Sequence, residues 1–425
     1  MSSAPSVQIR ADAELQARLA PLLPDETEPS TAELDAALAR VIWSRLAEPG
    51  DAVAGQLVAA LGASAAVDLV ASGAGARHIC DAAGDTTEVT LDARRVAAGL
   101  KRWLPRLDRA ATLEDLVRGA ESAMMLIAPG SALWPVQLDD LGDHAPLLLW
   151  VRGNPQRLSD RGLAVVGARA CTGYGAHVTA ELAEAACSAG ASIVSGAAYG
   201  IDAVAHRTAL ASEASTVAVV AGGADRPYPA AHTQLLQQIS TVGAICSEMV
   251  PGSAPTRWRF LMRNRVIAAL ATATLVTEAG MRSGSLNTAG HTAELGRSLG
   301  AVPGPVTSAA SSGCHRLVRE YGAELITNGE QVRELLGVDR LTADELDEPR
   351  ATADTGGERR SPTHRRVIDA LPLRGARTAE EVARLAGLAP DEARAALAEL
   401  ELLGAVARRE TPGELGTGWV LLRRE

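Results

Sequence analysis

The middle of the chain alternates between short, continuously apolar runs and longer segments in which apolar residues recur at helical spacing. Between residue 161 and about 337, the apolar runs are GLAVVGA, ASIVSGA, STVAVVAGG, GAICSE, TATLVTEAG and AVPGP. Strands that are apolar on both faces and separated by amphipathic helices are typical of a parallel sheet with helices on both sides. The pattern therefore predicts a doubly wound, mostly parallel α/β sheet.

The segments before this region follow other patterns. Residues 31–112 show helical spacing interrupted by Gly and Pro-Gly, which predicts a small helical domain, whereas residues 1–30 are expected to be a tail. In residues 113–160, Pro135, Pro146 and Pro155 separate short apolar runs. This stretch is interpreted as a connector packed against the larger domain. The predicted boundaries of that domain, with the connector included, are therefore residues 113–337.

The C-terminal region is expected to form a separate small domain. Residues 338–362 are polar, contain Gly and Pro, and are predicted to be a linker. Residues 363–425 hold three helical segments and two strand-like segments, the arrangement of a winged helix-turn-helix. Ten Arg and ten acidic residues in 361–425 cancel in charge, which favours a protein adaptor or a weak DNA contact.

Composition narrows the class of protein. A length of 425 residues suggests two to four domains at roughly 100–200 residues each, and 47% hydrophobic with 22% charged residues is typical of a globular chain. The net charge of −10 at first sight argues against a nucleic-acid binder, although it describes the whole chain and not any one face. Only one Lys is present, Lys101, and it does not lie in a GxxxxGK[ST] loop, which excludes a P-loop nucleoside triphosphatase.

Cysteine usage and the lack of long apolar runs indicate the compartment. The five Cys are scattered and show no CxxC spacing, so neither a disulfide framework nor a zinc knuckle is predicted. No stretch of 18 apolar residues and no signal-peptide pattern at the start are found. We expect a soluble, cytoplasmic protein without membrane contact, cofactor or bound metal.

Four Gly-rich turns follow predicted strands: GARACTGYG, SGAAYGID, AGGADRPYP and EAGMRSGSLNTA. Because the carboxyl ends of parallel strands share one edge of the sheet, the turns are expected to converge there, where small residues let a phosphate approach helix N-termini. None matches G-x-G-x-x-G, and each alone is compatible with plain strand-to-helix packing. Arg169, directly after the first predicted strand, would point into this crevice as a phosphate clamp or simply begin a helix at the surface.

The most informative segment is RWRFLMRNR, residues 257–265, which has four Arg in nine residues, no acid and the only Phe of the chain. Guanidinium groups pair with phosphate, and an aromatic ring offers a face on which an unpaired base can stack. The combination indicates single-stranded nucleic acid. The alternative is a solvated Arg-rich loop with Phe260 packed into the core.

Two groups of residues could be catalytic, but the sequence supports a catalytic role less well than nucleic-acid binding. Asp202 and His206 lie four residues apart and could form an acid/base pair, but a helix cap and a packed imidazole explain them more simply. Glu278 with Ser283 and Ser285 could perform hydrolysis, yet no G-x-S-x-G elbow is found. No catalytic residue is therefore predicted, and the lack of H-E-x-x-H spacing gives no reason to expect a catalytic metal.

Taken in order and spacing, VVGARACTGYG, VSGAAYGIDAVAH, AVVAGGADRPYP, FLMRNRVIAAL, VTEAGMRSGSLNTA and AELGRSLGAVPGP resemble the DNA-processing protein A (DprA, also called Smf) family. Weaker signals in AEPGD, WPVQLDDL, PLLLWVRG and the winged-helix tail extend the resemblance. It implies an extended Rossmann-like domain, with a small N-terminal domain of SAM or helix-hairpin-helix type.

The resemblance also implies a function. Members of the family bind single-stranded DNA and load the recombinase RecA onto it in natural transformation, without catalysis, and they displace or coexist with single-strand-binding protein. They form homodimers through the Rossmann-like domain, and RecA binds an overlapping surface.

Residue by residue, the resemblance places a DNA pocket at positions that match the family motifs. Arg169 would clamp phosphate, Phe260 would stack a base, and the Gly and Ser positions would supply phosphate-facing backbone and hydroxyl groups. The expected DNA-binding residues are Gly167, Arg169, Ser195, Gly196, Gly200, Arg257, Phe260, Arg263, Asn264, Arg265, Ser283, Gly284 and Ser285. Two departures, Leu261 for the usual Pro and Ala168 for the frequent Ser, affect the expected local loop geometry.

Two other functions compete with this one. Related Rossmann-like families hydrolyse nucleoside monophosphates, and Glu278 with Arg263 could serve such an enzyme. Their P-G-G-x-G-T-x-x-E pattern is missing, since the matching turn EAGMRSGSLNTA lacks the final acid. A regulatory scaffold that acts through the winged helix would leave the cluster of Arg257 to Arg265 unexplained.

Overall fold

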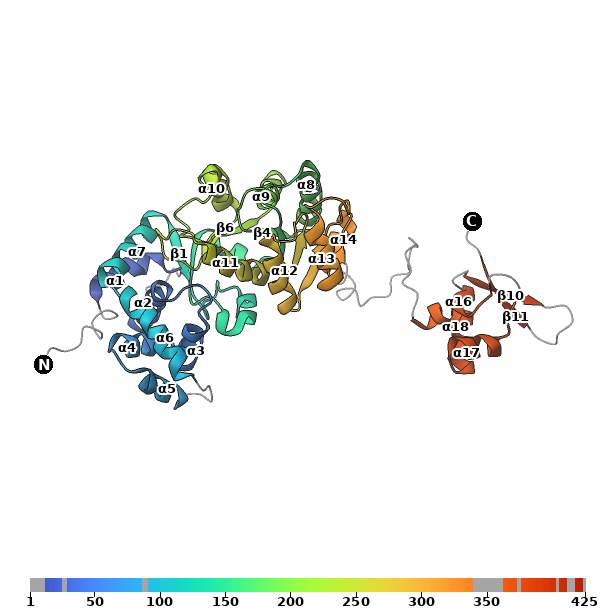
Figure 1. Cartoon of the computed structure of the whole chain (residues 1–425), viewed down its shortest axis with the longest axis horizontal. Coiled ribbons are helices and arrows are strands. Elements are labelled where there is room, and N and C mark those ends of the chain that lie inside the picture. The colour runs from blue at the N-terminus through green and yellow to red at the C-terminus, as the bar shows by residue number, and fades with distance from the viewer. Residues whose placement is uncertain are drawn as a thin grey trace. The chain divides into compact units, whose positions relative to one another are not determined.

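A computed structural model describes residues 12–24, 29–85, 91–338, 362–372, 376–402, 405–410 and 417–422. It divides into two compact units, Met1–Asp347 and Glu348–Glu425, which are considered separately (Figure 1). Among the residues described, the first unit contains a helical part and a large sheet, and the second contains three helices and a hairpin.

The helical part of the first unit consists of α1 (Ala13–Leu19), α2 (Thr31–Leu46), α3 (Ala52–Leu61), α4 (Ala63–Ala71), α5 (Ala76–Gly84), α6 (Ala93–Trp103) and α7 (Arg109–Glu121). Ser30 and Glu33 form a capping box at the start of α2, and Asp51 caps α3. Trp43 and Trp103 meet edge to face at 5.2 Å between ring centroids in the core. These contacts turn Ala-rich segments of modest individual stability into a packed domain.

Part of the stretch expected to be an N-terminal tail is helical. Asp12 accepts hydrogen bonds from the first backbone N–H groups of α1, and Leu15 and Leu19 are buried. With seven residues, α1 is too short for its periodicity to stand out in the sequence. Packing against α2 and α7 stabilises it instead.

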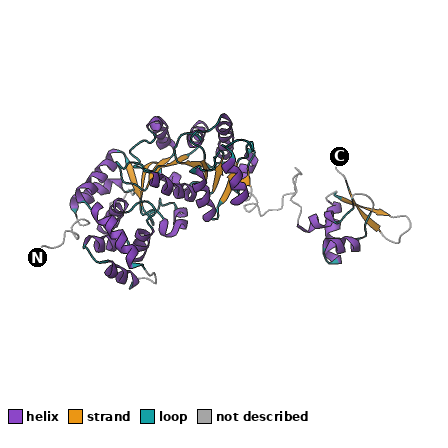
Figure 2. Cartoon of the chain, in the orientation of Figure 1, coloured by secondary structure: helices purple, strands orange, loops and turns teal. Residues whose placement is uncertain are grey.

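The sheet has nine strands in the order β1-β2-β6-β5-β4-β3-β7-β8-β9. Figure 2 shows strands of this sheet between helices of the first unit. The strands are β1 (Met124–Ile127), β2 (Leu149–Gly153), β3 (Gly162–Val166), β4 (Ser192–Ser195), β5 (Thr216–Val219), β6 (Ala244–Ser247), β7 (Ala273–Val276), β8 (Ser298–Ala301) and β9 (Glu324–Leu325). Strands β3 to β9 pair in parallel, whereas β1 and β2 add antiparallel at one side. The predicted mostly parallel, doubly wound sheet is confirmed.

Two details of the sheet differ from expectation. The connector at 113–160 contributes the strands β1 and β2, because its MMLI and LLLW runs extend the sheet beyond β6. The last predicted strand, AVPGP, is displaced toward the N-terminus, since only Ala301 of that run belongs to β8. The positive φ of 65° at Gly296 ends the preceding helix early and lets the strand begin at Ser298.

Helices cover both faces of the sheet. They are α8 (Gly173–Ser188), α9 (Ile201–Ala211), α10 (Thr233–Val242), α11 (Arg257–Leu270), α12 (Ser285–Glu294), α13 (Ser312–Glu320) and α14 (Gly329–Leu335). Figure 1 shows α8, α9 and α10 on one face and α11, α12 and α13 on the other. Along β3, Leu163 and Val165 belong to one core and Ala164 and Val166 to another, as the alternation of a strand requires.

The second unit contains α16 (Pro362–Asp369), α17 (Ala379–Ala386), α18 (Pro390–Leu402) and the antiparallel pair β10 (Val406–Glu410) and β11 (Thr417–Leu421). Val367, Leu397, Leu400 and Trp419 are buried between them. Three helices followed by a two-stranded wing confirm the predicted winged helix.

In the described part of the chain, none of the single helices is long and apolar enough to cross a membrane. Only α3 and α4 taken together meet the length and composition requirement, and they are bent by 112° where they join.

Candidate nucleic-acid interface

A groove of about 1080 Å³ lies at the carboxyl edge of the parallel strands. The turns after β3, β4, β5 and β7 and the first turns of α11 surround it, as expected for a ligand site in an open parallel sheet. Its main polar and aromatic lining residues are Arg169, Asp202, Tyr228, Thr256, Arg257, Phe260, Arg263, Asn264, Arg282, Ser283, Ser285 and Thr288.

Helix α11 divides the Arg-rich segment between the groove and the protein interior. The Thr256 hydroxyl caps the helix by accepting from the Arg259 N–H at 3.2 Å. At 3.6 residues per turn, Arg257, Phe260 and Asn264 share one face, which lines the groove. The segment is therefore neither a solvated loop nor a uniform basic patch.

The other two arginines of the segment face away from the groove. Arg259 binds both carboxylate oxygens of Glu48 at 2.8 and 2.9 Å. Arg265 is buried, pairs with both oxygens of Glu248 at 2.6 Å and donates to the His144 carbonyl at 2.8 Å. The structure thus places Arg265, expected to face DNA, in an anchor that holds α11 to its surroundings.

Phe260 lies within a cluster of cations and rings. The guanidinium carbons of Arg169 and Arg263 lie 5.0 and 5.9 Å from its ring centroid, within cation–π range. The Tyr228 ring is 5.5 Å away at an interplanar angle of 52°, and half of the Tyr228 side chain is exposed. Phe260 is itself partly exposed, so the groove contains an accessible aromatic surface bordered by positive charge.

Arg263 forms part of the groove floor and is only 6% exposed. Its Nη1 donates to the Val219 carbonyl at 2.7 Å, while its buried Nε has no hydrogen-bond partner among the described residues. A Cβ at Gly196 would overlap the guanidinium, so the glycine is required by this close approach. Burial lowers the pKa of Arg263 to about 10, and the nearby Asp202 carboxylate opposes that shift. Arg263 therefore remains charged at neutral pH. Its buried guanidinium packs against the Phe260 ring and does not extend into solvent.

Asp202 and His206 have separate structural tasks. One Asp202 carboxylate oxygen accepts from the Gly196 and Ala198 N–H groups, both at 3.2 Å, which shapes the turn after β4. Burial raises the pKa of Asp202, against the effect of the Arg263 charge. The buried His206 instead bonds the Thr216 hydroxyl at 2.7 Å, and burial lowers its pKa to about 3. The packing interpretation of this pair is the one that the hydrogen bonds support.

Glu278 occupies the N-terminus of α8. Its carboxylate accepts from the Thr172 N–H at 2.7 Å and from the Thr172 hydroxyl at 2.8 Å. A Cβ at Gly175 would overlap the Glu278 carboxylate. Ser283 and Ser285 bond each other at 2.7 Å instead of Glu278. The position where a phosphate meets a helix N-terminus in nucleotide-binding folds is thus filled by the protein's own carboxylate.

The predicted DNA-facing residues separate into two groups. Those that line the groove are Gly167, Arg169, Arg257, Phe260, Arg263, Asn264, Ser283, Gly284 and Ser285. Three others support it from behind: the Ser195 hydroxyl donates to the Val165 carbonyl at 2.6 Å, Gly196 makes room for Arg263, and Gly200, with φ of +77°, backs onto the Ala168 and Arg169 carbonyls. Together with Arg265, these do not line the groove.

Sequence reasoning missed Tyr228 and Arg282 as groove residues. Both lie in Gly-rich turns that the sequence singles out, AGGADRPYP and EAGMRSGSLNTA, but neither turn pattern tells which side chain points inward. The signal that could have found Tyr228 is an aromatic residue inside a predicted carboxyl-edge turn.

The groove is positively charged although the chain is not. Within the described part of the chain, the exposed side chains of Arg169, Arg257 and Arg282 make no ion pair or hydrogen bond, and Asp202 is the one acid in the groove lining. Helix α12 begins at Ser285 without a side-chain cap, so its N-terminal dipole adds to the field. A local basic site on an acidic protein focuses an anionic ligand there.

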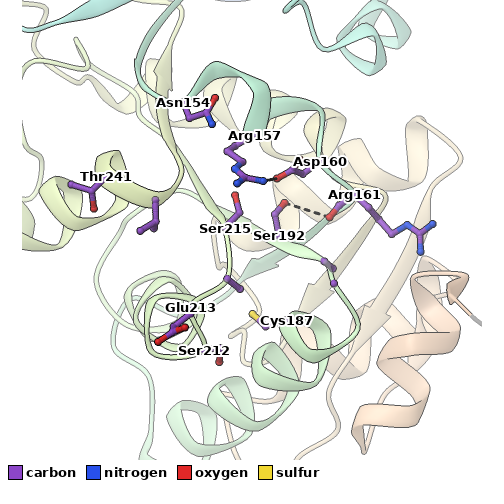
Figure 3. Close-up of a pocket in the computed structure, with 14 residues that line it drawn as sticks. Asn154, Arg157, Asp160, Arg161, Cys187, Ser192, Ser212, Glu213, Ser215 and Thr241 are labelled. Atoms are coloured by element: carbon purple, nitrogen blue, oxygen red, sulfur yellow. Dashed lines mark hydrogen bonds and ion pairs between the residues drawn. The ribbon is translucent and has the colours of Figure 1, made fainter.

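A second depression, of about 680 Å³, lies at the opposite, amino edge of the sheet (Figure 3). Arg157 pairs with Asp160 at 3.3 Å, and the Arg161 side chain extends away from the other lining residues in Figure 3. The ends of α8, α9 and α10 border it, and none of its described lining residues is aromatic. Over the described residues, no group of three or more His, Cys, Asp or Glu could hold a metal ion.

Two family models and several known proteins match this chain. The model of the DNA recombination-mediator protein A family matches residues 125–337, and that of the DprA winged helix domain matches residues 347–410. A protein of Mycobacterium tuberculosis named as a DNA processing protein DprA is 43% identical over 381 residues, which is 86% of this chain and 91% of the relative. The DNA processing protein DprA of Streptococcus pneumoniae is 41% identical over 199 residues, 47% of this chain and 70% of that protein.

A solved structure agrees with these matches. The X-ray structure of DNA processing protein A from Streptococcus pneumoniae superimposes with a TM-score of 0.56 and 30% identity, covering 70% of this chain and 96% of that one. The similarity therefore extends over both sequence and fold.

Proposed function

This chain belongs to the DNA recombination-mediator protein A family, and we propose that its carboxyl-edge groove binds single-stranded DNA. The observation that carries the proposal is Phe260, a partly exposed ring flanked by the guanidinium groups of Arg169 and Arg263 and by the ring of Tyr228. Such a surface suits a stacked base whose phosphates lie against arginines.

The preference for a single strand follows from the accessibility of the bases. In a duplex, base faces are covered by their neighbours, so a ring inside a groove can reach only an unpaired or extruded base. Stacking on a ring depends little on base identity, since every base has a π-face. The proposed binding is therefore tolerant of sequence and sensitive to salt, because Arg169, Arg257 and Arg282 replace counterions on the phosphates.

The finer functional proposal is that the protein loads RecA onto the strand it holds, as a homodimer formed through the sheet domain, in the uptake of DNA during natural transformation. Single-strand-binding protein would be displaced or accommodated on the same strand. We place this activity in the cytoplasm, to which the free cysteines also point. The family membership and the groove support this proposal, and no residue is assigned to the protein partners.

We further propose that the protein acts by binding and not by catalysis. The competing hydrolase would use Glu278, but that carboxylate is committed to Thr172 at the start of α8. Arg263, its suggested partner, is bonded to the Val219 carbonyl in the floor. No observation among the described residues favours the enzyme over the binding protein.

The first test is fluorescence anisotropy of a labelled oligo-dT with the full chain at two salt concentrations, with a duplex of equal length as competitor. The proposal expects binding that weakens with salt and is little affected by the duplex. An absence of binding at micromolar protein would contradict it and would make nucleotide hydrolysis the next activity to assay.

The RecA step needs its own assay. RecA is added to a single strand already coated with single-strand-binding protein, and filament formation is followed with and without this chain. Faster assembly is expected with the wild-type chain and not with a groove variant such as Phe260→Ala. Equal stimulation by both would separate RecA loading from the groove.

A further inference from the structure

A second aromatic side chain lies beside the groove without lining it. Tyr199, in the turn between β4 and α9, is 49% exposed. Its ring packs edge to face on His232, with centroids 4.9 Å apart at 67°. Neither the sequence motifs nor the groove assigns a task to this tyrosine.

The backbone holds Tyr199 at the rim of the groove. Its neighbour Ala198 lines the groove, and the Ile201 N–H donates to the Ala168 carbonyl at 3.2 Å. Gly200 lies directly against the backbone of Ala168 and Arg169. The turn that carries Tyr199 is therefore attached to the segment that presents Arg169.

His232 connects this rim to the ring cluster inside the groove. It is buried, and its Nδ1 bonds the Ala197 carbonyl at 2.9 Å. It also ends the short helical turn η5 (Ala230–His232), which follows Tyr228 and Pro229. Tyr228 in turn packs on Phe260 at 5.5 Å. The Phe260–Tyr228 and Tyr199–His232 ring pairs are thus joined through the short segment from Tyr228 to His232.

The two tyrosines have the properties of stacking surfaces. About half of each side chain is exposed, and each ring is braced by another ring, Phe260 for Tyr228 and His232 for Tyr199. A tyrosine ring that is already fixed loses little conformational freedom when a flat ligand covers it. Because the turn that carries Tyr199 packs against the backbone of Ala168 and Arg169, a strand that leaves the groove on that side would pass close to this ring.

We propose that Tyr199 forms a second stacking site, for an unpaired base of the same strand, outside the groove. This inference rests on the proposed binding of single-stranded DNA and extends it by a subsite. It predicts that strand length decides whether Tyr199 contributes, because a short oligonucleotide fills the groove alone.

The test compares Tyr199→Ala with Tyr199→Phe, which keeps the ring and removes the hydroxyl. Anisotropy is measured with oligo-dT of roughly 4 and roughly 16 nucleotides, which bracket the site sizes of single-strand binding folds. Tyr199→Ala should weaken binding of the longer strand about 5-fold, the lower end of the range for one stacked base. Binding of the short strand should be unchanged, and Tyr199→Phe should match the wild type on both.

A 16-nucleotide strand in which the bases outside the short segment are abasic provides the decisive control. The wild type and Tyr199→Ala should bind it equally. Equal losses on short and long strands would show that Tyr199 only supports the groove, and no loss on either would remove it from DNA binding. A variant that keeps full DNA affinity but fails to stimulate RecA would assign Tyr199 to a protein partner and overturn the subsite.

These outcomes differ from failure of the underlying function. If the wild type binds neither oligo-dT, single-stranded DNA binding itself is contradicted. If the wild type binds both and Tyr199→Ala is indistinguishable from it, only the second stacking site is lost.

Discussion

The two edges of the sheet carry depressions of opposite character, about 1080 Å³ at the carboxyl edge and about 680 Å³ at the amino edge. At the carboxyl edge, helices α11 and α12 begin, three arginines are exposed, and the ring of Phe260 is accessible. At the amino edge, helices α8, α9 and α10 end, and Arg157 is paired with Asp160 (Figure 3). Helix N-termini favour anions and C-termini disfavour them, so the same fold makes one edge suited to phosphate and the other not.

The two depressions differ in the state of their arginines and in their rings as well as in volume. Both depressions are open to solvent, and a guanidinium group lines each of them. Arg169 differs from Arg157 because it contacts a ring and makes no ion pair within the described part of the chain. Substitutions at Phe260 and Arg169 test whether this difference matters for binding, and a substitution at His206 tests the buried groups behind the carboxyl edge.

The largest effect is expected for Phe260→Ala. Removal of one stacked base contact, worth about 1–3 kcal/mol, should weaken binding of oligo-dT by about 5- to 150-fold. The salt dependence should change little, because no charge is removed. Phe260→Tyr keeps a ring on Arg169 and Tyr228 and should bind nearly as well. Equal losses for both variants would mean that shape and not stacking explains the site.

The next effect concerns the buried groups behind the carboxyl edge. His206 has an ordinary pKa of 6.5 in the unfolded chain and a pKa of about 3 when folded. Below pH 6.5 the unfolded state therefore binds a proton that the folded state refuses, so stability falls as pH drops toward 3. Between pH 7 and 5.5 this amounts to about 1 kcal/mol in the free energy of unfolding.

Denaturant unfolding at the two pH values measures this loss. His206→Gln should flatten the pH dependence by about that amount. His177→Gln, at a largely exposed histidine on α8, serves as the control and should leave it unchanged. An imidazole of His206 that titrates near pH 6.5 by NMR in the folded protein would contradict the assignment.

The smallest expected effect is on the salt dependence of binding, and it compares Arg169 at the carboxyl edge with Arg157 at the amino edge. If Arg169 contacts one phosphate, Arg169→Ala should lower the slope of log affinity against log salt by about 0.7. Arg157→Ala removes the same charge from the amino edge and should leave both slope and affinity for oligo-dT unchanged. Identical slopes for the two variants would contradict the proposal that Arg169, and not Arg157, contacts a phosphate.

Much of the candidate site could be predicted from the sequence because strand ends and Gly-rich turns follow one another along the chain. The sequence predicts Arg169 and Phe260 in one crevice. In the structure, the guanidinium carbon of Arg169 lies 5.0 Å from the centroid of the Phe260 ring. Arg265 was expected there too, but a helix distributes a run of arginines over several faces, and Glu248 takes this one. Arg263 reaches the groove only as its floor.

The sequence by itself determined the class of fold, the winged helix and the edge of the sheet that carries the site. These follow from local periodicity and from the rule that parallel strands end together. Only the tertiary structure decided which arginines remain free, that Tyr228 and Tyr199 are braced by other rings, and that Glu278 closes the start of α8. Those facts depend on partners far away in the chain, such as Glu48 for Arg259, and no local pattern encodes such a pairing.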